Sequence, residues 1–142
     1  MNIMQESDSI VIIPTYNEME NIEKIIRAVL GLEKNFHILV IDDNSPDKTG
    51  DEVERLIKTE FGGRLFIVHR SGKLGLGTAY IQGFKWALEH GYDYIFEMDA
   101  DFSHDPNDLP RLYAACHDEG YDLAIGSRYV SGVNVVNWPI GR

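Results

Sequence analysis

The chain has 142 residues, enough for one domain with its own core, and its formal net charge is −10, from 13 Lys and Arg against 23 Asp and Glu. This acidity argues against a nucleic-acid binder, which needs a basic face, and against simple electrostatic docking on an anionic membrane. The single cysteine, Cys116, excludes an internal disulfide, and its apolar neighbours predict a place in the core. The first residues lack the features of a signal peptide, and no apolar run approaches the roughly 20 residues that span a bilayer, so we expect a soluble, cytoplasmic protein.

Short apolar runs alternate with stretches of helical period along the chain. The predicted strands are residues 10–14, 36–41, 65–69, 94–98 and 123–126, and the predicted helices are residues 18–32, 50–61, 76–90 and 106–119. This alternation predicts an α/β fold built from parallel βαβ units, and strands that are apolar throughout predict helices on both faces of the sheet. In such sheets the ligand site lies beyond the carboxyl ends of the strands.

The first such loop, residues 14–18, reads PTYNE. Thr15 with Glu18 fits a capping box for the following helix. Capping does not require Tyr16 in such a loop, or Pro14 at the end of a strand. A helix cap and a ligand-binding loop therefore both stay open at this point.

The second loop begins with two adjacent carboxylates, Asp42 and Asp43. Adjacent carboxylates at the end of a buried strand repel each other, and the next helix can be capped by Thr49 and Glu52 without them. A carboxylate here suits hydrogen bonding to a nucleobase N–H or a ribose hydroxyl. We therefore expect at least one of the pair to bind a ligand.

The third loop, residues 70–77, reads RSGKLGLG. Its glycines and Lys73 suit a close approach of the backbone to a phosphate, but they equally suit a flexible loop that leads into a helix. The spacing matches neither the dinucleotide-binding nor the Walker glycine motif, so both of those interpretations fail.

The pair Asp99 and Asp101, separated by Ala100, follows the fourth predicted strand and carries the strongest chemical signal. Both carboxylates can face one point if the backbone turns there. Hard cations such as Mg²⁺ and Mn²⁺ take oxygen ligands and share them with substrate phosphates, so we expect a metal site, which Ser103 could also reach. Asp105 reads as a structural helix cap before a proline.

After the fifth predicted strand comes Arg128, in the phrase GSRY. An arginine at the carboxyl edge of a sheet suits bidentate binding of a phosphate. An ion pair with one of the aspartates is the alternative.

Together the phrases PTYNE, DDNSPD, LGLGTAY, MDADFSHDP and GSRY resemble those of family-2 glycosyltransferases of GT-A fold. LGLGTAY and GSRY move the resemblance toward the polyprenol-phosphate (dolichol-phosphate) mannosyltransferases. It extends from about residue 10 to residue 142, and the motifs are specific as a set, although each is weak alone.

The resemblance implies a role for each matching residue. The nucleotide pocket would be lined by Pro14, Tyr16, Glu18, Ile41 and Asp43, with Asp43 on the base. The sugar-diphosphate and its Mg²⁺ or Mn²⁺ would be held by Asp99, Ala100 and Asp101, with Asp101 the stronger ligand and Ser103 the third candidate. Arg128 would bind a phosphate, in the first place that of the acceptor, and would be catalytic together with Asp101.

The implied reaction moves a hexose, in the first place mannose from GDP-mannose, to a polyprenyl phosphate, with inversion at the anomeric carbon. A phosphate nucleophile is already ionised at neutral pH, so catalysis would depend on positioning and charge stabilisation. The alternatives are a transferase for a UDP-hexose with a different acceptor, and a nucleotide-sugar-binding module without turnover.

Proteins of this kind run well past position 142, so we expect residues 1–142 to be a single, C-terminally truncated transferase domain that lacks the acceptor region. The missing part would supply basic phosphate contacts and a membrane-facing helix for peripheral membrane association. Uncovered apolar surface at the truncated end favours self-association into a homo-oligomer.

Three other α/β classes fit the order of the motifs less well. A response-regulator receiver has its acidic pair after the first strand, whereas here the pair follows the second. A haloacid-dehalogenase phosphatase has its D-x-D motif after the first strand, whereas here that motif follows the fourth. A nucleotidyltransferase opens with a glycine-rich basic loop, which PTYNE is not.

Overall fold

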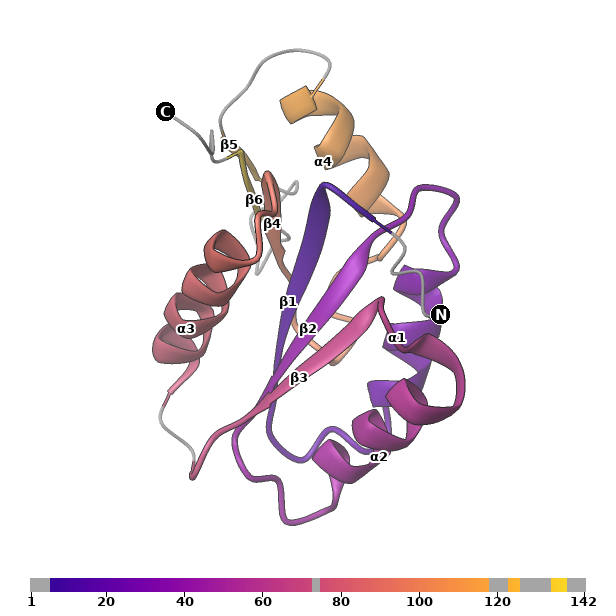
Figure 1. The fold of residues 1–142 in the computed structure, drawn as a ribbon, viewed down its shortest axis with the longest axis vertical. Helices are drawn as coiled ribbons and strands as arrows, with labels where there is room; N and C mark the ends of the chain where they lie inside the picture. The colour runs from indigo at the N-terminus through magenta and orange to yellow at the C-terminus, as the bar shows by residue number, and fades with distance from the viewer. Residues whose placement is uncertain (1–5, 73–74, 118–122, 126–133, 138–142) are drawn as a thin grey trace.

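A computed structural model describes residues 6–72, 75–117, 123–125 and 134–137. Within them one sheet has the strand order β3-β2-β1-β4-β6-β5 (Figure 1). The strands are β1 (Ser9–Thr15), β2 (His37–Asp42), β3 (Leu65–His69), β4 (Tyr94–Glu97), β5 (Leu123–Ile125) and β6 (Asn134–Asn137). The first four run parallel, and β6 lies antiparallel between β4 and β5.

Helices cover both faces of this sheet, as predicted. They are α1 (Ile22–Leu30), α2 (Thr49–Leu56) with a π-helical continuation η1 (Ile57–Phe61), α3 (Leu76–Glu89) and α4 (Asp108–His117). Figure 1 shows α1, α2 and α4 on one side of the sheet and α3 on the other. In the part of the chain that the structure describes, none of these helices has the length and apolarity to cross a membrane.

The period-two alternation of the strands divides the core into two layers. Side chains that pack toward α1, α2 and α4 include Val11, Ile13, Ile38 and Val40, whereas Ile10, Ile12, Leu39 and Ile41 pack toward α3. Cys116 is buried in the first layer, as predicted.

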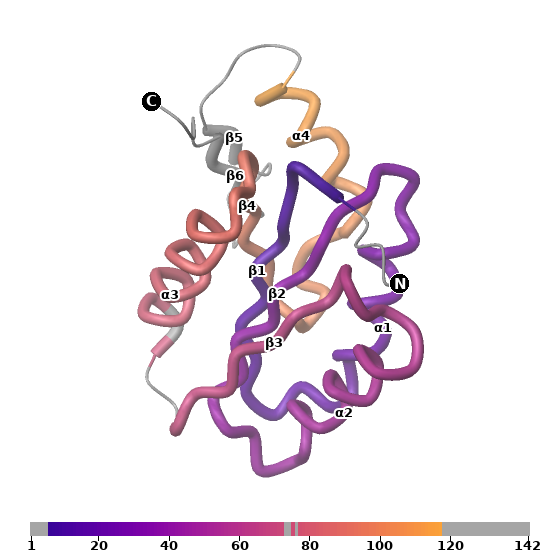
Figure 2. The backbone as a smooth tube through the Cα atoms, in the orientation of Figure 1, coloured from indigo at the N-terminus to yellow at the C-terminus, as the bar shows by residue number. Residues whose placement is uncertain are grey.

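Gly83 lets α3 lie close against β1. A Cβ atom at this position would come within 2.7 Å of Cγ2 of Ile12, so only a glycine fits without a shift of the helix or of the Ile12 side chain. The same helix carries Thr78, Ala79 and Tyr80 in its first turns. Figure 2 shows the chain leaving β1, β2 and β3 at the lower end of the view, where α3 begins.

The capping box that Thr15 and Glu18 could have formed for the first helix is absent. The helix begins at Ile22, not at Glu18, and its N-cap has no side-chain hydrogen bond. The backbone N–H of Glu18 instead donates to Thr49 Oγ1 at 3.0 Å, and the Thr15 hydroxyl donates to Asp42 Oδ1 at 2.6 Å. These bonds across two loops take the place of a local cap, and they tie the loops after β1 and β2 together.

The described residues contain one more strand than the five predicted. The sixth, β6, reads NVVN, and two apolar residues are too short a run to indicate a strand. Because β6 pairs antiparallel with both of its neighbours, the sheet is mixed, although mostly parallel, as in the Rossmann-like GT-A fold that the resemblance implies.

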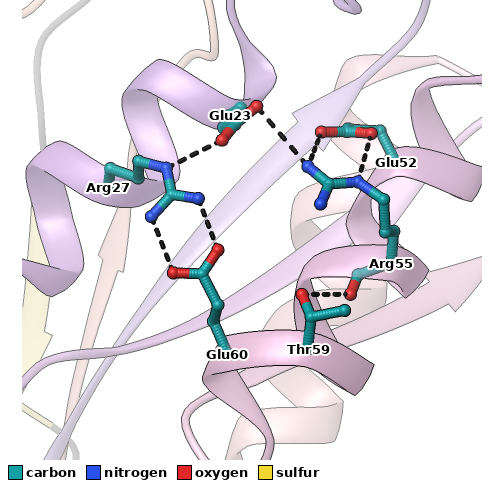
Figure 3. A network of polar contacts seen from close by, with 6 residues as sticks. All are labelled: Glu23, Arg27, Glu52, Arg55, Thr59 and Glu60. Carbon is teal, nitrogen blue, oxygen red and sulfur yellow. Dashed lines mark hydrogen bonds and ion pairs between the residues drawn. The ribbon is translucent and has the colours of Figure 1, made fainter.

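Exposed ion pairs join α1, α2 and η1 on the outer surface (Figure 3). Arg27 pairs with Glu23 at 2.8 Å and with Glu60 at 2.5 Å, and Arg55 pairs with Glu52 at 2.6 Å. Exposed pairs of this kind contribute little to stability because water screens them.

Candidate active site

A cleft of about 290 Å³ opens beyond the carboxyl ends of the parallel strands. Its walls come from the loops after β1, β2 and β4 and from the start of α3. We call it the acidic cleft; it is lined by Pro14, Thr15, Tyr16, Glu18, Asp43, Gly75, Ala79, Asp99, Ala100 and Asp101. Most of the residues predicted to bind a nucleotide sugar therefore lie around one cavity.

Three predicted site residues do not line this cleft. Ile41 is fully buried, because strand alternation turns its side chain into the core layer beneath α3. Ser103 lines a separate cavity with His104 and Asp105, and its backbone N–H donates to Asp101 Oδ1 at 2.9 Å. Arg128 lies outside the described residues.

The backbone turns sharply after the D-x-D motif. Phe102 has a φ of 63°, a left-handed conformation that is uncommon for a non-glycine residue. The chain therefore changes direction directly after Asp101, and both Asp99 and Asp101 line the acidic cleft.

Several negative groups gather at this cleft. A hydrogen bond from Ser103 lowers the pKa of Asp101, so this carboxylate is ionised at neutral pH. Burial raises the pKa of Glu18, and the nearby charges of Asp101 and Asp99 act in the same direction. A bound cation would relieve this repulsion.

The donor set fits a hard divalent cation that shares its ligands with a substrate. Among the residues that the structure describes, no group of three or more His, Cys, Asp and Glu side chains could hold a metal by itself. Two carboxylates, from Asp99 and Asp101, match the usual binding of Mg²⁺ through one or two carboxylates together with substrate phosphates and water.

Asp42 and Asp43 have different surroundings. Asp42 is 2 % exposed and accepts hydrogen bonds from the Thr15 hydroxyl, the Ser45 hydroxyl and the Ser45 N–H, at 2.6, 2.7 and 3.0 Å. These bonds hold the two loops together and give Asp42 a structural role. Asp43 lines the cleft instead.

Arg70 and Tyr80 belong to the surroundings of the cleft, and the sequence interpretation missed both. Arg70 forms a bidentate ion pair with Asp43, and the Tyr80 hydroxyl donates to Asp99 Oδ1 at 3.1 Å. A signal for the ion pair was present in the sequence. Asp43 is the first residue after β2, and Arg70 is the first residue after the neighbouring parallel strand β3. Because Asp42 pairs with His69 in the sheet, the register brings Asp43 and Arg70 side by side.

A sequence model described as Glycosyl transferase family 2 matches residues 10–142. The chain is 51 % identical over 134 residues to polyprenol monophosphomannose synthase of Mycolicibacterium smegmatis. The matched region covers 94 % of this chain and 50 % of that protein. It is 46 % identical over 133 residues to undecaprenyl-phosphate mannosyltransferase of Micrococcus luteus, and this match covers 94 % of this chain and 53 % of that protein. The chain thus spans about half the length of these curated relatives.

The fold is also similar to solved structures. Mannosyltransferase PcManGT from Pyrobaculum calidifontis, in complex with GDP-Man and Mn²⁺, superposes with a TM-score of 0.75 at 18 % identity, over 92 % of this chain and 44 % of that one. TarS from S. aureus, in complex with UDP-GlcNAc, superposes with a TM-score of 0.63 at 22 % identity, over 80 % of this chain and 32 % of that one. This likeness confirms the predicted GT-A fold.

Proposed function

The chain belongs to glycosyl transferase family 2, and on that premise we propose that the protein transfers mannose from GDP-mannose to a polyprenyl phosphate, with inversion at the anomeric carbon. One observation carries the proposal: Asp43, suited to a nucleobase, and the pair Asp99 and Asp101, suited to a metal-bound diphosphate, line the same cleft. The mannosyltransferase activity in the names of the relatives supports the choice of sugar and acceptor.

In this proposal, each wall of the acidic cleft has its own task. Asp43 accepts hydrogen bonds from the N–H groups of the base, and Tyr16 and Pro14 bound the nucleotide on the side of the β1 loop. Asp99 and Asp101 hold Mg²⁺ or Mn²⁺ together with the sugar-diphosphate. The metal, when bound, stabilises the negative charge that develops on the diphosphate leaving group.

The transfer itself needs no general base from the protein. A phosphate monoester with a second pKa of about 6 is already ionised at neutral pH. Its oxygen forms a bond to the anomeric carbon as the bond to the diphosphate breaks, and GDP leaves with the electron pair. The protein positions the two substrates in line and keeps them aligned. Arg128 is the proposed partner of the acceptor phosphate.

A binding panel tests the choice of donor. GDP-mannose, UDP-glucose and UDP-N-acetylglucosamine are titrated into the protein, each without metal, with Mg²⁺ and with Mn²⁺, and affinity is measured by calorimetry. We expect GDP-mannose to bind best, and only with a divalent cation at full affinity. Tighter binding of either UDP-sugar would contradict the choice of GDP-mannose.

A transfer assay tests the reaction. The protein expressed from its complete reading frame is incubated with GDP-mannose, radiolabelled in the sugar, and undecaprenyl phosphate. We expect label in the lipid phase, as a β-linked mannosyl phosphate. Binding of GDP-mannose without any transfer would favour a nucleotide-sugar-binding module instead.

A further inference from the structure

Arg70 makes four side-chain hydrogen bonds beside the acidic cleft. Its Nε and Nη2 donate to the two carboxylate oxygens of Asp43 at 2.5 and 2.9 Å. Nη2 also donates to the Gly75 carbonyl at 3.1 Å, and Nη1 donates to Thr78 Oγ1 at 3.0 Å. Arg70 is 8 % exposed and Asp43 is 7 % exposed.

This arrangement fixes the Asp43 carboxylate in one orientation. Two parallel N–H···O bonds from a planar guanidinium set the plane of the carboxylate as well as its position. The bonds from Arg70 to Gly75 and Thr78 in turn fix the guanidinium itself. Asp43 is therefore held by a group that cannot rotate freely.

The two partners differ in their access to the cleft. Asp43 and Gly75 line it, but Arg70 does not, so the guanidinium lies behind the carboxylate. Four of its N–H···O contacts are already made within the protein. This use of its donors argues against a direct contact between Arg70 and a phosphate.

Arg70 also connects two segments that are far apart in the sequence, the loop after β2 and the start of α3. Its contacts connect the loop after β2 with the residue before α3 and with the first turn of that helix. The Thr78 hydroxyl donates to the Gly75 carbonyl at 2.8 Å, which closes this small network. Gly75 has a φ of 104°, a conformation that favours glycine.

We propose that Arg70 is a positioning residue for nucleotide recognition, which holds the Asp43 carboxylate in place for the N–H donors of the base and does not bind the diphosphate. This inference rests on the proposed function, because it requires that a nucleotide occupies the acidic cleft. Arg70 would act through Asp43, so its substitution should weaken the binding of the base and not that of the diphosphate.

The test compares guanosine with GDP, because the two share the base but only GDP has a diphosphate. Their affinities for the unchanged protein and for Arg70→Lys are measured without metal by NMR titration, well below the melting temperature. A lysine keeps the charge but cannot form the bidentate pair. We expect both ligands to bind about tenfold more weakly, the equivalent of losing one charge-assisted hydrogen bond.

Arg27→Lys is the matched control. Arg27 also forms a bidentate pair with a carboxylate, that of Glu60, but this pair is exposed on the outer surface and does not line the cleft (Figure 3). We expect this substitution to leave both affinities unchanged. The double variant with Asp43→Asn and Arg70→Lys should bind no more weakly than Asp43→Asn alone, because Arg70 acts only through Asp43.

Each result decides the inference. A loss of affinity for GDP but not for guanosine would assign Arg70 to the diphosphate and overturn it, as would unchanged affinity for both ligands. If Arg70→Lys does not fold, Thr78→Ala removes one anchor of the guanidinium at an exposed position, and it should weaken both ligands by the same few-fold factor. If the unchanged protein binds GDP-mannose with metal, but Arg70→Lys changes the affinity for neither guanosine nor GDP, this inference alone fails. If it binds no nucleotide at all, the proposed function fails with it.

Discussion

The Tyr80 hydroxyl, from the first turns of α3, donates a hydrogen bond to Asp99 Oδ1 at 3.1 Å, at the end of β4. Burial, with the negative charge of Asp99, raises the pKa of Tyr80, so the phenol stays protonated and remains a donor at every working pH. The bond orients one of the two carboxylates proposed to bind the metal.

Tyr80→Phe should therefore weaken Mn²⁺ binding roughly tenfold, in the range that outer partners of metal ligands usually contribute. Mn²⁺ affinity in the presence of GDP is measured by electron paramagnetic resonance. Tyr113→Phe is the control, because the Tyr113 hydroxyl also donates to an aspartate, Asp8 at 2.7 Å, outside the cleft. Equal Mn²⁺ affinity of the two variants would contradict a role for Tyr80 at the metal.

Asp101→Asn should abolish the Mn²⁺-dependent stabilisation of the protein by nucleotide. The apo melting temperature should hardly change, because Asp101 is exposed and its hydrogen bond from the Ser103 N–H is a local one between residues two positions apart. Thermal shifts with GDP-mannose, with and without Mn²⁺, are compared for the unchanged protein, Asp101→Asn and Asp108→Asn. The last variant makes the same charge change outside the cleft. A large loss of apo stability with intact Mn²⁺-dependent binding would assign Asp101 a structural role instead.

The position of the cleft could be predicted because it depends on local patterns. Apolar runs such as residues 10–14 indicate strands by themselves, and the carboxyl ends of parallel strands meet at one edge of the sheet. Polar residues that follow those runs, such as Asp43 and Asp99, were therefore expected close together, and both line the cleft.

The contacts between loops could not be predicted in the same way. The Glu18 N–H bonds to Thr49, although a local capping box with Thr15 looked equally good in the sequence. Which of the two forms depends on the register of β1 against β2, where Thr15 lies opposite Asp42. The pairing of Asp43 with Arg70 has the same origin in the register of β2 against β3. The strand β6 was missed because its pairing partners, and not its own four residues, define it.

Gly83→Ala should destabilise the protein by about 1–3 kcal/mol, the usual cost of an added group in a packed core. The new methyl group would meet Ile12 Cγ2 at 2.7 Å, so α3 or the buried Ile12 side chain must shift. Urea unfolding followed by circular dichroism measures the free energy of unfolding. Gly77→Ala is the control in the same helix, because a Cβ atom there meets nothing within 4 Å, and it should not destabilise the protein. Equal effects of the two substitutions would contradict the steric argument.

Asp8→Asn should lower the free energy of unfolding at pH 7 by about 1 kcal/mol, through the loss of a charged hydrogen-bond acceptor. Burial alone would raise the pKa of Asp8, but hydrogen bonds from Lys34, Tyr113 and Ser9 outweigh it, and the pKa lies below its ordinary value of 3.8. The ionised group therefore stabilises the folded state fully above pH 3.8, and this contribution is lost as the pH falls through the lower pKa of the folded protein.

Unfolding in urea at pH 7, 5 and 3 measures this dependence. The difference between the unchanged protein and Asp8→Asn should be the same at pH 7 and 5 and smaller at pH 3. Asp93→Asn, which neutralises an exposed carboxylate just before the neighbouring strand β4, should show no such trend. A difference that stays constant down to pH 3 would show that the charge of Asp8 does not stabilise the fold.

The adjacent residues Asp42 and Asp43 should separate stability from nucleotide binding. The Asp42 carboxylate accepts three hydrogen bonds inside the protein, so Asp42→Asn should lower the melting temperature. Because Asp42 does not line the cleft, the same substitution should leave the affinity for GDP within about twofold. Asp43→Asn should weaken GDP binding at least tenfold, because a carboxylate that accepts from the base becomes an amide. It should also cost stability, since the buried charge of Arg70 loses its partner.

Both variants are therefore titrated with GDP by calorimetry at a temperature where each is fully folded. The ratio of the two affinities is the decisive quantity, because loss of stability is common to both substitutions and only a nucleotide contact distinguishes them. Equal losses of GDP affinity would mean that the loop as a whole, and not the Asp43 carboxylate, contacts the nucleotide.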